Sequence, residues 1–159
     1  MSKCELGKTS LVYLGHIIGG GDLKIDPSKV DFILNWPRPK TIIEVSFLGA
    51  TQYWRKFIAN FSFITTPLHT LTSVKKVFQW GGKQQKAFDA LKEKISIALV
   101  LSLSYLRQSF DIQANASDYA MGEVLMQHDK SICFHSETFN GAMINYPTYD
   151  KELLHWYRV

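Results

Sequence analysis

The sequence predicts an α+β fold, in which a part rich in helices is followed by a mixed sheet and one more helix. Three observations predict it. Apolar residues recur at helical spacing through the middle of the chain, β-branched and aromatic runs lie on either side, and prolines and glycines separate these segments. With 159 residues, 46% of them hydrophobic, the chain can bury a core; it is not a disordered chain, a collagen-like repeat or a disulfide scaffold.

Charge is distributed unevenly along the chain, whose net charge is +4. Residues 1–110 carry 15 Lys or Arg and 7 Asp or Glu, a balance of +8, whereas residues 111–159 carry 3 and 7, a balance of −4. We therefore expect the first part to suit polyanions and the second part to suit metal cations or basic groups.

Cysteine content and hydropathy indicate a compartment. Cys4 and Cys133 are the only cysteines, too few for a disulfide framework or a zinc cluster, and they suit a reducing environment. The first residues have no apolar core of the signal-peptide type, and the longest apolar run, near Ile95 to Leu103, is too short to span a bilayer. We expect an intracellular protein, cytoplasmic or nuclear, with no membrane partner.

The first predicted element is a strand over residues 11–18, which are rich in β-branched and aromatic residues. The glycine cluster at residues 19–22 ends it, and residues 23–25 are the candidate returning arm of a hairpin. A helix follows, with Asp26 as its cap and Pro27 in its first turn. Its apolar face consists of Val30, Ile33 and Leu34. Prolines 37 and 39 end it, because the residue before a proline avoids the helical region.

A second helix is predicted from Thr41, which forms a capping box with Glu44, to about residue 58. Its apolar stripe consists of Phe47, Ala50, Trp54, Phe57 and Ile58. Arg55 and Lys56 fall away from most of that stripe, towards solvent or a partner. Such a pair is most often an ordinary solvated face; the alternative is contact with a nucleic acid.

The remaining elements are shorter. A short helix is expected around Pro67, and a longer one over residues 83–94 with Ala87, Phe88, Leu91 and Ile95 facing inward. Strand-like segments follow at residues 99–103, 110–114, 120–126 and 132–136. A last helix begins near Thr148.

Several stretches also resemble, in order and spacing, the reverse transcriptase region of gypsy-type long-terminal-repeat retrotransposons. They are Leu14-Gly15-His16-Ile17-Ile18, Asp26-Pro27-Ser28-Lys29-Val30, Trp36-Pro37-Arg38-Pro39, Phe47-Leu48-Gly49-Ala50, Tyr53-Trp54-Arg55-Lys56-Phe57-Ile58, Phe61-Ser62, Pro67-Leu68, Phe78-Gln79-Trp80 and Ala87-Phe88-Asp89-Ala90-Leu91-Lys92. Later stretches resemble the ribonuclease H domain of the same Pol polyproteins. They are Asn115-Ala116-Ser117-Asp118, Val124-Leu125-Met126-Gln127, Asn145-Tyr146 and Tyr149-Asp150-Lys151-Glu152-Leu153-Leu154.

The resemblance implies a division of the chain. Residues 1–25 resemble the last hairpin of the polymerase palm, the primer grip, and residues 26–75 resemble the helices of the thumb. Residues 76–109 resemble the connection, and residues 110–159 resemble the N-terminal half of the ribonuclease H domain. The expected fold is thus a helical thumb-like part followed by a truncated ribonuclease H-like mixed sheet with its first helix.

The same resemblance implies that the first part binds duplex nucleic acid or an RNA–DNA hybrid. Leu14 and Gly15 are expected in the primer-grip strand, and Lys29, Arg55 and Lys56 are expected to contact phosphates. Contacts with phosphates position a duplex without reading its sequence. Trp36 is expected near the sugars; the alternative is a core aromatic beside the following proline.

The residues expected for catalysis are incomplete. The family's polymerase holds two metal ions about 4 Å apart with aspartates of a Tyr-x-Asp-Asp loop, and the dipeptide Asp-Asp occurs nowhere in this sequence. At the first ribonuclease H position the family has aspartate, whereas this chain has Asn115, a neutral amide. The helix carboxylate corresponds to Glu152, for which the alternative is an ordinary solvated glutamate.

Neighbouring carboxylates do not replace the missing aspartate. On a strand that continues past Asn115, Asp118 points to the face opposite to that of Asn115. Asp111 shares the face of Asn115 but lies roughly 13 Å from it along the strand. We expect no bound metal as the chain stands, although the family uses Mg²⁺ or Mn²⁺, and no metal site unless Asn115 is restored to aspartate.

Three functions remain open from the sequence. The first is a catalytically inactive, retrotransposon-derived fragment that still binds a duplex or hybrid. The second is RNA-directed DNA polymerase or ribonuclease H activity as part of a larger polyprotein. The third is a non-catalytic interaction module, which self-associates or binds the remainder of a Pol polyprotein.

Overall fold

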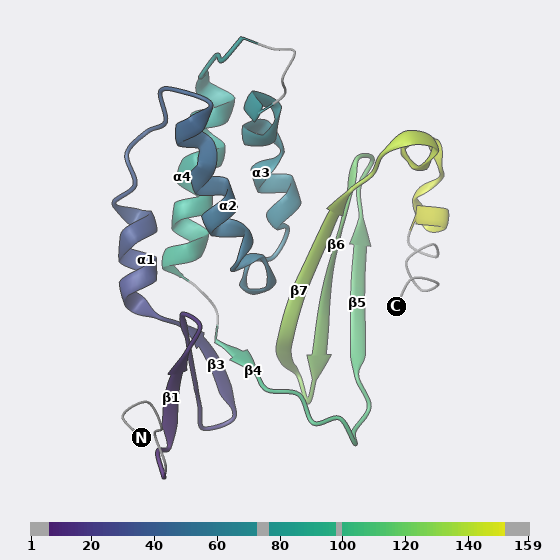
Figure 1. Cartoon of the computed structure of the whole chain (residues 1–159). Coiled ribbons are helices and arrows are strands. Elements are labelled where there is room, and N and C mark those ends of the chain that lie inside the picture. Colours follow the sequence, from purple (N-terminus) through teal and green to yellow (C-terminus); the bar gives the residue numbers. More distant parts are fainter. Residues whose placement is uncertain (1–6, 73–76, 98–99, 152–159) are drawn as a thin grey trace.

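The computed structural model describes residues 7–72, 77–97 and 100–151 and shows an α+β fold (Figure 1). Its helices lie together, one antiparallel sheet lies at an end of this group, and a second antiparallel sheet stands beside it. The fold class predicted from the sequence is confirmed. Where a mixed sheet is expected, every strand pair among the described residues is antiparallel.

The first sheet has four strands in the order β1 (Ser10–Tyr13), β2 (His16–Gly19), β3 (Asp22–Ile25) and β4 (Leu101–Ser102). The prediction of one strand over residues 11–18 is wrong, because Leu14 and Gly15 form a turn between β1 and β2. Their φ angles, 48° and 74°, are both positive, as in the two-residue turns whose twist matches that of paired strands. Residues 23–25 do form the returning arm, within β3.

α1 (Pro27–Leu34) begins and ends where the sequence predicts. The Asp26 carboxylate accepts a hydrogen bond from the Ser28 N–H (3.0 Å), which satisfies a donor left open at the helix start. Ile33 is fully buried, whereas Leu34 is only half-buried. At the other end, Lys92 Nζ donates to the carbonyl of Leu34 (2.7 Å) and to that of the following loop at Trp36 (2.6 Å).

The helix predicted from Thr41 to residue 58 is divided into three pieces, η1 (Ile43–Ser46), α2 (Phe47–Gln52) and η2 (Arg55–Phe57). Trp54 breaks it, with φ −106° and ψ 10°. The prediction of one continuous helix is therefore wrong, although Trp54 and Phe57 are buried as expected. The two tighter 3₁₀ turns re-aim the chain so that these rings still face the core.

α3 (Phe61–His69), η3 (Thr70–Thr72) and α4 (Gly82–Ser96) complete the helical group, and α3 packs against α4. The expected inward face of α4 is confirmed, since Ala87, Phe88, Leu91 and Ile95 are all buried. The largest fully buried side chains of the core come from the helical group and from β4: Ile33, Phe47, Phe57, Ile58, Phe61, Leu68, Leu91, Ile95 and Leu101.

The second sheet is a meander of β5 (Asp111–Ala116), β6 (Ala120–Gln127) and β7 (Lys130–Thr138). β7 faces the helical group and contacts α3, η2 and β4. The strands predicted at residues 110–114, 120–126 and 132–136 are confirmed with small shifts. η4 (Gly141–Asn145) follows, and residues 148–151 are helical, as predicted near Thr148.

Candidate nucleic-acid interface

The turn between β1 and β2 is held against the helical group. Its Gly15 carbonyl accepts a hydrogen bond from the Asp26 N–H (3.1 Å), just before α1, and its Leu14 carbonyl accepts one from the Tyr53 hydroxyl. A Cβ placed on Gly15 would lie 3.8 Å from Cγ of Lys29 and 3.9 Å from Cε1 of Tyr53. The turn, the start of α1 and the end of α2 therefore meet at one place.

His16 lies directly behind this turn and is buried. Its ring stacks on Tyr53 at 4.9 Å and 8° and tilts against Phe57 at 5.4 Å. Burial, and secondarily the Lys56 ammonium, lower the pKa of His16. The imidazole is therefore neutral near pH 7, so it supports the turn by packing and supplies no positive charge.

Four of the six residues predicted for nucleic-acid contact gather here. Leu14 is 68% exposed and Lys29 is exposed. Lys56 is half-buried, with its Nζ 5.5 Å from the centre of the Phe57 ring, and its ammonium influences both His16 and Cys133 of β7. We call Leu14, Gly15, Lys29, Tyr53 and Lys56 the hairpin-turn patch. The role of Tyr53 was not predicted from the sequence, although Tyr53 begins one of the stretches that resemble the retrotransposon family.

Arg55 lies elsewhere: it is half-buried and reaches towards the second sheet. Its Nη2 donates to the carbonyl of Ser136 on β7 (2.8 Å), 81 residues away in the sequence. Arg55 therefore joins the helical group to the second sheet. Because part of its guanidinium is committed to this backbone oxygen, it does not belong to the hairpin-turn patch.

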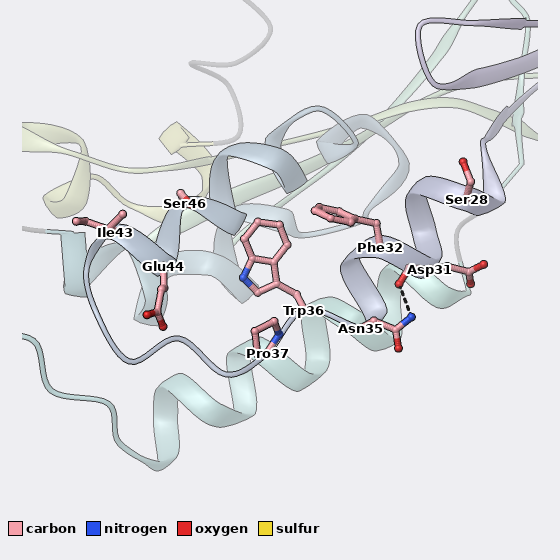
Figure 2. Close-up of a pocket in the computed structure, with 9 residues that line it drawn as sticks. All are labelled: Ser28, Asp31, Phe32, Asn35, Trp36, Pro37, Ile43, Glu44 and Ser46. Carbon is pink, nitrogen blue, oxygen red and sulfur yellow. Dashed lines mark hydrogen bonds between the residues drawn. The ribbon is translucent and has the colours of Figure 1, made fainter.

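Trp36 is also separate from the patch. It is half-buried and packs edge-on against Phe32 (5.1 Å, 87°) beside an open groove of about 810 Å³ (Figure 2). Asp31 and Glu44 line the same groove, and no Lys or Arg of the described residues does so. These carboxylates would repel a phosphate, which argues against Trp36 as a neighbour of a nucleic-acid backbone.

The expected ribonuclease H position lies on the second sheet. Asn115 is exposed on β5, opposite Gly122 on β6, and Asp111 is exposed on the same side of that strand. Glu152 lies outside the described residues. Within the ranges that the structure describes, no three His, Cys, Asp or Glu side chains are grouped to hold a metal ion. The donors that are described at Asn115 therefore do not fit the family's metal pair, which requires anionic oxygens.

One carboxyl of the second sheet has an unusual environment. Glu123 on β6 is half-buried, and burial, reinforced by the Glu137 carboxylate, raises its pKa to about 7. It lies between Ala114 on β5 and His135 on β7 in the strand register. Ionisation of Glu123 therefore costs free energy, because the carboxylate is partly removed from water.

Comparison with protein families matches residues 80–158 to the RNase H-like domain found in reverse transcriptase. The chain is 36% identical over 156 residues to the retrovirus-related Pol polyprotein from transposon 297 of Drosophila melanogaster, covering 97% of this chain and 15% of that protein. It is 38% identical over 111 residues to the uncharacterized mitochondrial protein AtMg00860 of Arabidopsis thaliana, covering 68% and 70%. The chain thus spans a small share of the Pol polyproteins that it matches.

Solved structures share the fold. The foamy viral protease-reverse transcriptase in complex with RNA/DNA hybrid superposes with a TM-score of 0.86 at 22% identity, over 99% of this chain and 22% of that one. The same enzyme in complex with dsDNA gives a TM-score of 0.84, over 95% of this chain and 33% of that one.

None of the described helices has the length and apolar character needed to cross a membrane.

Proposed function

Residues 80–158 belong to the RNase H-like domain family of reverse transcriptases, and the chain is a homologue of retrotransposon Pol polyproteins; from this premise we propose that it binds duplex nucleic acid, in particular an RNA–DNA hybrid, through the hairpin-turn patch. The observation that carries the proposal is the meeting of an exposed backbone turn with Lys29, Tyr53 and Lys56. Ammonium groups attract phosphates, and an exposed tyrosine beside them offers a face for a sugar or base.

Charge along the chain supports this proposal. Residues 1–110 carry the balance of +8, and Lys24, Lys29 and Lys40 are exposed in the part that includes the patch. Binding to phosphates by such side chains releases counterions and is therefore weakened by salt. These contacts carry no base readout, so we expect little dependence on the sequence of the duplex.

The test is a salt titration of the chain's affinity for a labelled RNA–DNA hybrid, measured by fluorescence anisotropy. Each of Lys29→Ala and Lys56→Ala should weaken binding and reduce the salt slope by about 0.9 for each phosphate that the variant no longer neutralises. Lys130→Ala, an exposed lysine of the second sheet, is the matched control and should leave both unchanged. Absence of binding near roughly 50 mM salt, or equal losses in all three variants, would reject the proposal.

We further propose that the chain does not catalyse hydrolysis or polymerisation by itself, because Asn115 supplies an amide where the family's metal pair requires a carboxylate. Asn115→Asp should gain Mg²⁺- or Mn²⁺-dependent thermal stabilisation that the parent lacks, without hybrid cleavage. Gln113→Asp adds the same charge on the same face of β5 and should show no such response. Equal metal responses in both variants would remove Asn115 from this role.

The alternative is enzymatic activity, as part of a larger polyprotein or with carboxylates from another chain. Its support is the homology with Pol polyproteins. Metal-dependent cleavage of a labelled hybrid that Glu152→Gln abolishes would establish this alternative. We also propose that the chain is of the gypsy type and that it divides into four parts at residues 25, 75 and 109. Its proposed place of action is the cytoplasm or the nucleus.

A further inference from the structure

A groove on the surface of the helical group is left unexplained by nucleic-acid binding. One wall is the outward side of α1 with Asp31 and Phe32, and the other is η1 with Ile43 and Glu44 (Figure 2). Trp36 lies between them. We call these five residues the acidic groove. Its volume of about 810 Å³ falls within the range of binding pockets in proteins.

The walls of the acidic groove are apolar and exposed. Phe32 is 60% exposed and Ile43 is 84% exposed, although neither side chain is needed to fill the core that lies behind α1 and α2. Trp36 contributes its ring, which packs edge-on against Phe32 and is tilted against Phe47 at 6.2 Å. Contiguous exposed apolar side chains of this kind mark surfaces where another molecule binds.

The charge of the groove is opposite to that of the part of the chain around it. Asp31 forms no ion pair or side-chain hydrogen bond among the contacts that the structure describes, and Glu44 accepts one hydrogen bond, from the Lys40 N–H (2.6 Å). Two of the nearby cations are engaged elsewhere, whereas Lys29 and Lys40 are exposed. Lys92 is bound to the carbonyls at the end of α1, and the Arg38 guanidinium lies 5.6 Å from the centre of the Trp80 ring.

The two carboxylates lie on different walls, with Trp36 between them. A ligand with two cationic groups, one on each side of an apolar group, complements both walls. α1 has eight residues and is therefore about 12 Å long, which matches two turns of a helix or a short extended segment. A phosphate-bearing ligand would meet repulsion from both walls.

We infer that the acidic groove binds a basic segment of a partner polypeptide, in which an apolar side chain packs on Trp36 between Phe32 and Ile43, and a Lys or Arg on each side pairs with Asp31 and Glu44. The recognition is that of an amphipathic segment in an apolar groove, with charge setting its orientation. This surface is separate from the hairpin-turn patch, so that both partners can be bound by one chain.

The probe is a fluorescein-labelled amphipathic peptide of about 12 residues, with leucines four apart among lysines, titrated with the full chain. The control peptide has glutamine at every lysine position. We expect the lysine peptide to bind, and the glutamine peptide not to bind up to roughly 1 mM. Ile43→Ala or Phe32→Ala should weaken binding about tenfold, as truncation of a central apolar contact does.

Charge is tested with the paired neutralisation Asp31→Asn plus Glu44→Gln, which keeps the hydrogen-bond acceptor for Lys40. It should weaken peptide binding about fivefold, an effect that salt reduces. Glu93→Gln, an exposed carboxylate on α4, is the matched control and should change nothing. All five residues are on the surface or half-buried, so circular dichroism should show each variant folded.

Three results would overturn the inference. The first is equal binding of both peptides, or binding that none of the groove variants alters. The second is a weaker affinity of Ile43→Ala or Phe32→Ala for the RNA–DNA hybrid, which would assign the groove to the nucleic acid. The third is a concentration-dependent doubling of mass that Ile43→Ala abolishes, which would assign it to a second copy of the chain.

Discussion

The helical group and the second sheet of this protein bury their side chains in different ways. Among the residues that the structure describes, every buried residue of the main core lies between Ile25 and Leu101, and the second sheet adds only the partly buried Phe134 to it. The buried apolar residues of residues 111–151 are limited to Ala120, Met121 and Phe139. The helical group is therefore stabilised by apolar burial, whereas the second sheet relies on its backbone ladder and on contacts with the helical group.

The contact between these two regions combines hydrogen bonds with aromatic packing. The Ser62 N–H donates to the Ser136 hydroxyl (2.9 Å), and both the Ser62 hydroxyl (2.7 Å) and Arg55 donate to the Ser136 carbonyl. The edge-on pair of Phe63 and Tyr119, at 5.2 Å, adds an aromatic contact. The hydrogen bonds around Ser136, which is itself buried, therefore help to position the second sheet beside the helical group.

The largest expected effect separates the two regions directly. Trp54→Ala, in the helical core, should lower the free energy of unfolding by about 3–5 kcal/mol, because it leaves a cavity among buried side chains. Phe134→Ala on β7 should cost about 1–2 kcal/mol, since that ring is only partly buried. Urea unfolding measures both. A loss under about 1 kcal/mol for Trp54→Ala would show that its ring faces solvent.

The second prediction concerns the contact between the regions. Ser136→Ala removes the acceptor of the Ser62 N–H and should cost about 1–2 kcal/mol. In hydrogen exchange, β5 to β7 should exchange faster than α3 and α4 in the parent, and faster still in this variant. Thr138→Ala, an exposed position on the same strand, is the control. Equal protection of both regions in the parent would contradict the difference in burial between them.

The third prediction uses the pH dependence of the second sheet. Because the pKa of Glu123 is raised to about 7 in the folded state, its contribution to stability is fully present below its ordinary pKa of 4.5. That contribution is lost as pH rises towards and through 7. Glu123→Gln should therefore be more stable than the parent at pH 8, by on the order of 1 kcal/mol, and similar to it at pH 4. Thermal unfolding between pH 4 and 8 measures the difference.

The smallest effect is a pH dependence of stability in the helical group, in the direction opposite to that of Glu123. The pKa of His16 is lowered from 6.5, so its contribution to stability is present above pH 6.5 and is lost as pH falls through the lowered value. NMR titration of the ring should give a pKa below 6.5, and His16→Gln should lose this acid dependence. A pKa above 6.5 would show that the ring is not enclosed by Tyr53 and Phe57.

Local pattern determined much of this protein. The cap at Asp26, the inward face of α4 and the three strands of the second sheet follow from side-chain spacing and turn residues, because periodicity decides which residues one element can bury together. The amide at Asn115 is likewise a property of the sequence alone. The family, too, is recognisable from the order and spacing of its motifs along the chain.

Only the tertiary structure decided where the remaining residues act. Leu14 bends into a turn because Gly15 follows it and Tyr53 holds its carbonyl, although residues 11–18 alone are typical of one strand. Arg55 faces Ser136, and the acidic groove forms only where α1 and η1 come together around Trp36. These contacts join residues far apart in the chain, and their geometry depends on how whole elements pack, which local spacing does not specify.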